Sequence, residues 1–149
     1  MIYSKTIITP IGKLGLYADD TNLLRITLCA ADKKDNSNKI LTETEKQLQE
    51  YFSGKRREFT IPLKLKGTEF RKKVWEQLQK IPFGETISYQ ELAERVGNYN
   101  KARAVGNANH YNPIPIIVPC HRVVRKSGDL GGFGGGLNVK EYLLKLENK

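Results

Sequence analysis

The stretch SYQELAERVGNYNKARAVGNANH, residues 88–110, decides the fold of the C-terminal half of the chain. Ser88 and Glu91 have the spacing of a capping box, and Gly97 is the residue type that commonly ends a helix, so we expect a helix between them. After a short polar turn, residues 101–109 predict a second helix. Two helices joined by a short turn are typical of a helix-turn-helix, although short helix pairs also occur in many other folds.

Two further helices are predicted on either side of this pair. Apolar residues recur at helical spacing within residues 68–81, and we expect Phe70 and Trp75 of this segment in the core. Pro82-Phe-Gly84 ends that pattern. Near the C-terminus, the apolar stripe of a last helix consists of Val139, Tyr142, Leu143 and Leu146.

The N-terminal half predicts a small antiparallel sheet. Residues 3–9, 12–17 and 23–29 are rich in Ile, Thr, Leu and Tyr, and turn signals separate them. Residues 59–65 are expected to form a further strand or an extended connector. The composition then shifts near Lys66, which divides the chain into domains 1–66 and 67–149.

One helix is predicted within the N-terminal domain. Thr42 with Glu45 has the capping-box spacing, so the helix begins there and continues to about Phe52. Gly54 follows as the residue that closes it.

The run Pro119-Cys-His-Arg-Val123 carries the candidate chemistry, because it places a thiol beside an imidazole and a guanidinium. A thiol reacts as its thiolate, and nearby cations or a histidine lower the pKa of a thiol, so Cys120 is the candidate nucleophile. An isolated Cys-His pair is more often structural, since cysteine is frequently buried. If Cys120 and His121 cooperate, the backbone must turn between residues 119 and 122, because a flat strand would point their side chains to opposite faces.

Composition limits the class of partner and the compartment. The 149 residues include 25 Lys and Arg against 16 Asp and Glu, and the net charge of +9 suits nucleic acid, although a merely lysine-rich protein would match it too. Cys29 and Cys120 lie far apart, and the chain has no signal-like start or membrane-length apolar span. We therefore expect free thiols, a cytoplasmic location and no membrane contact, with Cys29 as a structural hydrophobe. The chain lacks metal-ligand spacing of Cys and His, so no metal is expected.

The run at 119–123, together with the segment before it (112–119) and the glycine-rich stretch after it, resembles the O6-alkylguanine-DNA alkyltransferases. The resemblance is strong from about Phe70 to Glu147. Within it the family's residues follow in order and spacing: Tyr89, the Arg-Ala-Val-Gly run at 103–106, Asn112, Gly131, Gly132, Leu137 and Lys140.

This resemblance implies an α+β fold, with a ribonuclease H-like N-terminal sheet and a helical C-terminal domain whose helix pair is a winged-helix-like helix-turn-helix. It also implies DNA repair. The protein would transfer an alkyl group from O6-alkylguanine, and from O4-alkylthymine, in double-stranded DNA to its own Cys120, with base flipping. The transfer is irreversible and stoichiometric; we expect no cofactor and a monomeric protein.

The resemblance further implies roles for the residues around Cys120. Glu147 orients His121, and His121 acts through a water to deprotonate Cys120. Asn112 braces the segment by hydrogen bonding. Without the resemblance, Glu147 would be interpreted as a frayed helix end and Asn112 as a turn residue.

The second helix of the pair is unusual for its small residues. Beside Lys101 and Arg103, the segment contains Ala102, Ala104 and Gly106. Small side chains allow close approach to the DNA backbone and minor groove, and they equally favour helix packing. By the resemblance, Arg103 enters the duplex in place of the extruded base, and Tyr89 helps to rotate the nucleotide and donates a hydrogen bond to the leaving guanine.

The resemblance places the base pocket among Tyr89, Val123, Phe133 and Gly134. The carbonyls of Cys120 and Val123 would accept from the guanine amino group, and the amide of Gly134 would donate to its oxygen. Some relatives carry serine where this chain has Gly134, so the smaller residue is expected to admit bulkier alkyl groups.

Two rival functions remain for the same residues. A lesion-binding module would flip the damaged base without an acceptor, and Cys120 argues against it. A cysteine hydrolase using Cys120 and His121 would turn over repeatedly, whereas an alkyl acceptor acts once.

Overall fold

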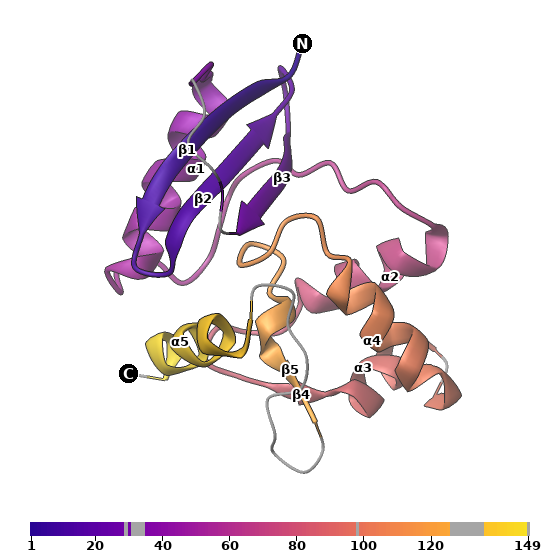
Figure 1. Cartoon of the computed structure of the whole chain (residues 1–149). Coiled ribbons are helices and arrows are strands. Elements are labelled where there is room, and N and C mark those ends of the chain that lie inside the picture. Colours follow the sequence, from indigo (N-terminus) through magenta and orange to yellow (C-terminus); the bar gives the residue numbers. More distant parts are fainter. Residues whose placement is uncertain (29, 31–34, 98, 126–135, 149) are drawn as a thin grey trace. The chain divides into compact units, whose positions relative to one another are not determined.

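The computed structural model describes residues 1–28, 30, 35–97, 99–125 and 136–148. The chain forms two compact units, Met1–Leu65 and Lys66–Lys149 (Figure 1). The first unit holds a small antiparallel sheet and the second is mainly helical, which confirms the predicted α+β class.

The sheet of the first unit contains three strands, β1 (Tyr3–Thr9), β2 (Gly12–Ala18) and β3 (Leu23–Leu28), in the order β1-β2-β3. All neighbours are antiparallel, as predicted. Glycine at position 15 makes room for Thr27, because an added Cβ would lie 2.5 Å from Thr27 Oγ1 and would force that side chain to move. Cys29 lies outside the described residues, so its structural role stays a prediction.

Helix α1 (Lys39–Phe52) packs on all three strands (Figure 1). The prediction that Thr42 caps this helix is wrong: Asn38 is the N-cap, and its side chain accepts from Leu41 N at 3.1 Å. Asn38 Nδ2 also donates to Asp19 O at 3.0 Å, a tertiary contact that the local sequence does not reveal. The helix ends before Gly54, as expected, and Gly54 adopts a φ of +79°.

Residues 59–65 form an extended connector, one of the two predicted alternatives. Leu23 N donates to Pro62 O at 2.8 Å, and Lys64 N donates to Leu23 O at 3.1 Å. These two bonds attach the connector to the start of β3, and no longer ladder forms.

The second unit is built from α2 (Glu69–Leu78), α3 (Tyr89–Val96), α4 (Ala102–His110) and α5 (Leu137–Glu147). Helices α2, α3 and α4 pack against one another, and buried Trp75 donates its Nε1 hydrogen to Ala108 O at 2.8 Å. The predicted helix pair is confirmed, since Ser88 accepts from Glu91 N and Gly97 ends α3 with a φ of +98°. None of the helices in the described residues is long and apolar enough to cross a bilayer.

A two-stranded parallel sheet connects two distant parts of the second unit. Strand β4 (Ile87–Ser88) pairs with β5 (Val123–Val124) in the register Ile87↔Val123. The sequence did not predict these strands, because two residues show no periodicity. Their pairing brings the first residue of α3 beside the chain that follows Cys120.

We predict that Asn38→Ala lowers the free energy of unfolding by about 1 kcal/mol, the usual cost of losing an N-cap. Thr42→Ala is the matched variant, because it removes a hydroxyl that only back-bonds to Asn38 O. Urea unfolding should show the larger loss for Asn38→Ala. A larger loss for Thr42→Ala would show that Thr42, and not Asn38, caps the helix.

Candidate active site

Cys120 begins a single turn of 3-10 helix, Cys120–Arg122. Cys120 N donates to Val118 O at 2.8 Å, and Arg122 N donates to Pro119 O at 3.0 Å. The predicted turn is therefore confirmed, and consecutive side chains no longer point in opposite directions. Both the thiol of Cys120 and the ring of His121 are buried.

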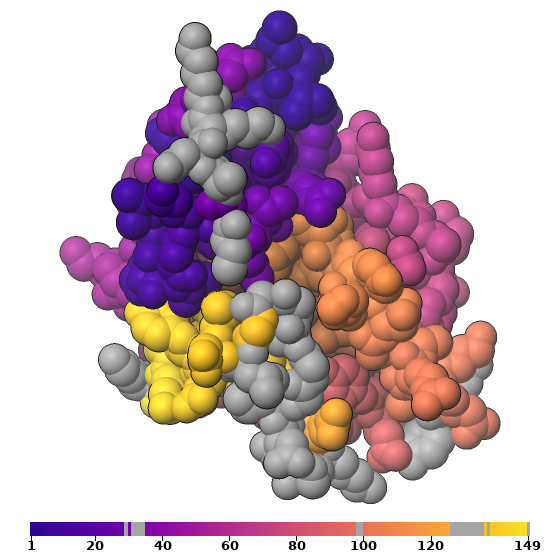
Figure 2. Space-filling view, viewed as in Figure 1, coloured from indigo at the N-terminus to yellow at the C-terminus, as the bar shows by residue number. Residues whose placement is uncertain are grey.

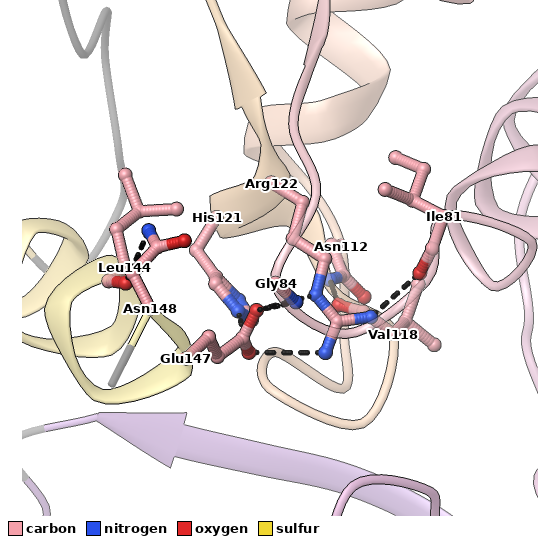
Figure 3. Close-up of polar contacts among 9 residues, drawn as sticks. All are labelled: Ile81, Gly84, Asn112, Val118, His121, Arg122, Leu144, Glu147 and Asn148. Atoms are coloured by element: carbon pink, nitrogen blue, oxygen red, sulfur yellow. Dashed lines mark hydrogen bonds and ion pairs between the residues drawn. The ribbon is translucent and has the colours of Figure 1, made fainter.

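The segment that leads into this turn is held by Asn112. Its Nδ2 donates to Val118 O at 2.7 Å (Figure 3). Its Oδ1 accepts from Ile114 N at 3.0 Å. Ile116 adopts a φ of +75°, a left-handed conformation that is unfavourable for a β-branched residue. Asn112 and the burial of this segment hold the strained backbone in place.

A network of buried charges lies behind the turn, centred on the last residue of α5. Glu147 Oε2 is 2.7 Å from His121 Nε2, and both oxygens accept from Arg122, at 2.8 Å from Nε and 3.0 Å from Nη2 (Figure 3). Arg122 Nη1 also donates to Ile81 O at 2.6 Å, and Gly84 N donates to Glu147 Oε1 at 3.4 Å. The network thus ties α5 to the Cys120 turn and to the loop after α2.

Burial and hydrogen bonding set the protonation states of this network. Burial opposes the charge of Glu147, but the hydrogen bonds from His121 and Arg122 outweigh it and hold the pKa of the carboxyl below its usual range. Burial lowers the pKa of His121, so its imidazole is neutral at pH 7. Because Nε2–H faces Glu147, Nδ1 carries the lone pair, and Nδ1 has no hydrogen-bond partner among the described residues. His121 can therefore accept a proton at Nδ1.

The thiol of Cys120 is protonated at rest. Burial raises its pKa to about 11, although a hydrogen bond with Asn112 and the positive charge of Lys140 act in the opposite direction. The expectation that adjacent groups lower this pKa is wrong for the resting protein, because Arg122 is bound to Glu147 and His121 is neutral. A thiolate must therefore form by proton transfer to a base.

Lys140 is a buried cation to which the sequence analysis gave no role. Its Nζ donates to Val123 O at 2.6 Å and lies 5.9 Å from the centre of the Tyr89 ring, and burial lowers its pKa to about 8. The predicted apolar face of α5 is corrected accordingly: Tyr142 is exposed, whereas Lys140 and Glu147 are buried with Leu143. The spacing 140, 143, 147 was the available signal, since it puts these residues on one helix face.

Tyr89 is the first residue of α3 and is half-buried. Burial raises the pKa of its hydroxyl, which is therefore a hydrogen-bond donor at pH 7. A Cβ added at Gly106 would lie 3.7 Å from two carbons of the Tyr89 ring, an ordinary van der Waals distance, so α4 packs on the Tyr89 ring here and alanine would also fit.

Helix α4 presents different residues to solvent and to the protein interior. Lys101, Arg103 and Ala104 are exposed, Ala102 and Gly106 are half-buried, and Val105, Ala108 and Asn109 are buried. Burial of Ala108 agrees with helix packing, whereas DNA contact by the exposed positions stays a prediction. Figure 2 shows the orange segment that includes α4 at the molecular surface.

The structure brings buried Cys120, His121 and Glu147 together with half-buried Asn112, and Val123 is also buried beside them. Phe133 and Gly134 lie outside the described residues, so their roles and the alkyl-size hypothesis stay predictions. Among the described residues, no three His, Cys, Asp or Glu side chains lie close enough together to hold a metal ion.

Comparisons with known proteins agree with this arrangement. Residues 2–65 match the family model for the 6-O-methylguanine DNA methyltransferase ribonuclease-like domain, and residues 69–149 match the model for the DNA binding domain. A methylated-DNA–protein-cysteine methyltransferase of Methanosarcina acetivorans is 43% identical over 146 residues, which cover 93% of this chain and 94% of that protein.

Two solved structures are also similar. The crystal structure of Mycobacterium tuberculosis OGT in complex with DNA has a TM-score of 0.91 and 43% identity, and the match covers 97% of this chain and 92% of that one. The S. pombe Atl1 complex with damaged DNA containing O6-carboxymethylguanine has a TM-score of 0.50 and 31% identity, covering 55% of this chain and 78% of that one.

We predict that Glu147→Gln lowers the free energy of unfolding at pH 7 by about 3–5 kcal/mol, because it leaves the Arg122 charge buried without its partner. Since folding lowers the pKa of Glu147, the stabilisation is complete above the unfolded-state pKa of about 4.3 and is lost progressively below it.

Urea unfolding at neutral and acidic pH measures both effects. The variant should lose less stability than the wild-type protein on acidification. Glu141→Gln, on the exposed side of the same helix, is the control and should change stability little. Equal pH dependence in the wild-type protein and Glu147→Gln would contradict the assignment of the buried charge.

Proposed function

The chain belongs to the 6-O-methylguanine DNA methyltransferase family, and from this we propose that it repairs DNA by moving the alkyl group of an O6-alkylguanine to Cys120. The observation that carries the proposal is the buried Cys120 turn, in which His121 has an unpartnered Nδ1 and a Glu147-bound Nε2. The protein is a methylated-DNA–protein-cysteine methyltransferase. Its product is a thioether with no easy route to hydrolysis, so each molecule acts once.

The proposed reaction follows from the protonation states. His121 takes the thiol proton at Nδ1 through a water, and Glu147 stabilises the resulting imidazolium. Sγ then attacks the alkyl carbon in line, so that the S–C bond forms as the C–O6 bond breaks. The electron pair of the broken bond stays on the guanine. Its developing charge is countered by the Tyr89 hydroxyl and by the Lys140 ammonium near the Tyr89 ring.

DNA is the partner, and we propose that α4 contacts it. Arg103 and Ala104 are exposed on α4, Lys101 is exposed directly before it, and the net charge of +9 favours a polyanion. Arg103 would occupy the space of the extruded base, where its guanidinium can stack on the neighbouring bases. Ala102 and Gly106 are half-buried and small, so they allow close approach of α4 to the DNA. Such approach suits minor-groove contact with little sequence readout.

The remaining parts of the proposal concern organisation. Residues 67–149 hold the DNA-binding and acceptor groups, residues 1–66 support them, and a monomer suffices for the reaction. Double-stranded DNA is the substrate form, and O4-alkylthymine is a second substrate class.

We predict that wild-type protein, incubated with an excess of duplex containing O6-methylguanine, gains one methyl group per molecule, located on Cys120. Intact-mass and peptide-mass spectrometry measure the adduct, and Cys120→Ser should form none while the lesion persists. Since general-base catalysis contributes about 10²- to 10⁴-fold, His121→Ala should form the same adduct more slowly by that factor. Repeated lesion removal by each protein molecule would indicate a hydrolase instead.

We predict that Arg103→Ala slows alkyl transfer from duplex DNA by about tenfold or more, because base extrusion costs a few kcal/mol that the guanidinium helps to offset. Transfer from free O6-benzylguanine should be unchanged, since a free base needs no extrusion. Arg95→Ala removes an exposed positive charge from α3 and controls for charge alone. Equal slowing on duplex and free base would exclude the extrusion role.

A further inference from the structure

We propose that Asn109 is a specificity residue for the damaged base, and that its Oδ1 accepts a hydrogen bond from the exocyclic amino group of the extruded O6-alkylguanine. This inference rests on the proposed function and names a contact that neither the sequence analysis nor the resemblance assigned. It starts from an unsatisfied polar atom in the described residues.

Asn109 lies near the end of α4 and is only 4% exposed. Its Nδ2 donates to Cys120 O at 3.3 Å, and its side chain also hydrogen-bonds that of Tyr89. The carbonyl of Cys120 can only accept, so the amide nitrogen must face it and the orientation of the amide is settled by chemistry. The amide thus lies between the nucleophile's backbone and the tyrosine proposed to contact the guanine.

Two buried side-chain atoms in the described chain lack a hydrogen-bond partner, Asn109 Oδ1 and His121 Nδ1. Leaving a buried acceptor unsatisfied costs free energy, so such atoms are uncommon and call for an explanation. His121 Nδ1 has a role as the proton acceptor. Asn109 Oδ1 has none until a ligand brings a donor.

Both carbonyls that the resemblance assigned to the guanine amino group already have donors in this protein, and Cys120 O has no capacity left. Cys120 O accepts from Val123 N as well as from Asn109 Nδ2, and a carbonyl oxygen has two lone pairs. Val123 O accepts from the Lys140 ammonium at 2.6 Å. Val123 O keeps one lone pair, which can accept one of the two amino hydrogens of the guanine, and Asn109 Oδ1 is the unoccupied acceptor beside Cys120 O for the other.

The chemistry of the damaged base identifies the matching donor. Alkylation at O6 removes the N1 hydrogen of guanine, which leaves the 2-amino group as the donor on its Watson–Crick edge. O6-methylhypoxanthine lacks that amino group. O4-methylthymine has lost its N3 hydrogen and offers no N–H donor. Asn109 would therefore favour alkylated guanine over both of these bases.

The test compares single-turnover rates of methyl transfer from three duplexes, which carry O6-methylguanine, O6-methylhypoxanthine or O4-methylthymine at the same position. We expect wild-type protein to react faster with the guanine than with the hypoxanthine lesion. Asn109→Leu, of similar size, should reduce this ratio by about two- to tenfold, the effect of one neutral hydrogen bond. The ratio of hypoxanthine to thymine rates should not change.

A ratio of two rates on one variant is insensitive to general loss of activity, which matters because Asn109 also contacts Cys120 and Tyr89. Gln47→Leu removes a buried amide from α1 and should leave the ratio unchanged. Asn109→Ala serves as a second variant if the leucine protein does not fold.

The outcomes separate this inference from the proposed function. Equal wild-type rates on guanine and hypoxanthine lesions, or an unchanged ratio in the Asn109 variants, would overturn the inference while the Cys120 adduct still formed. Absence of an adduct with every duplex would overturn the proposed function itself.

Discussion

The buried carboxylate of Glu147 is the group on which the rest of the site depends. Removing a carboxylate from water is costly, and the hydrogen bonds from His121, Arg122 and Gly84 offset that cost. Those donors belong to different segments of the second unit, so the single carboxylate fixes the end of α5, the Cys120 turn and the loop after α2 relative to one another. Its main effect is orientation, because it holds Nε2 of His121 and leaves Nδ1 without a hydrogen-bond partner among the described residues.

Burial also explains how neighbouring residues in one turn have different roles. Burial raises the pKa of Cys120, which stays protonated, and lowers the pKa of His121, which stays neutral. Arg122 keeps its charge because it is paired with Glu147. A buried, protonated thiol reacts slowly with oxidants and stray electrophiles. In the proposed reaction, which uses the cysteine once, this would protect Cys120 until the damaged base is bound and His121 takes the thiol proton.

Much of the fold was predictable because its signals are local. Helix caps and glycine stops lie within a few residues of the backbone they control, and Ser88, Gly97 and Gly54 all act where the sequence placed them. Strand boundaries followed from alternation and turn residues. The turn at Cys120 was predictable for a chemical reason, since a thiol and an adjacent imidazole can share a task only when the backbone bends.

The sequence by itself therefore determined the helices, the three strands of the first unit and the turn at Cys120, and it named the candidate reacting groups. Only the tertiary structure decided that Asn38 replaces Thr42 as a cap, that Lys140 is buried where Tyr142 was expected, and that the pKa of Cys120 is raised. These outcomes depend on partners far away in the chain. Propensity and capping act over a few residues, whereas desolvation and charge pairing depend on which segments meet in space.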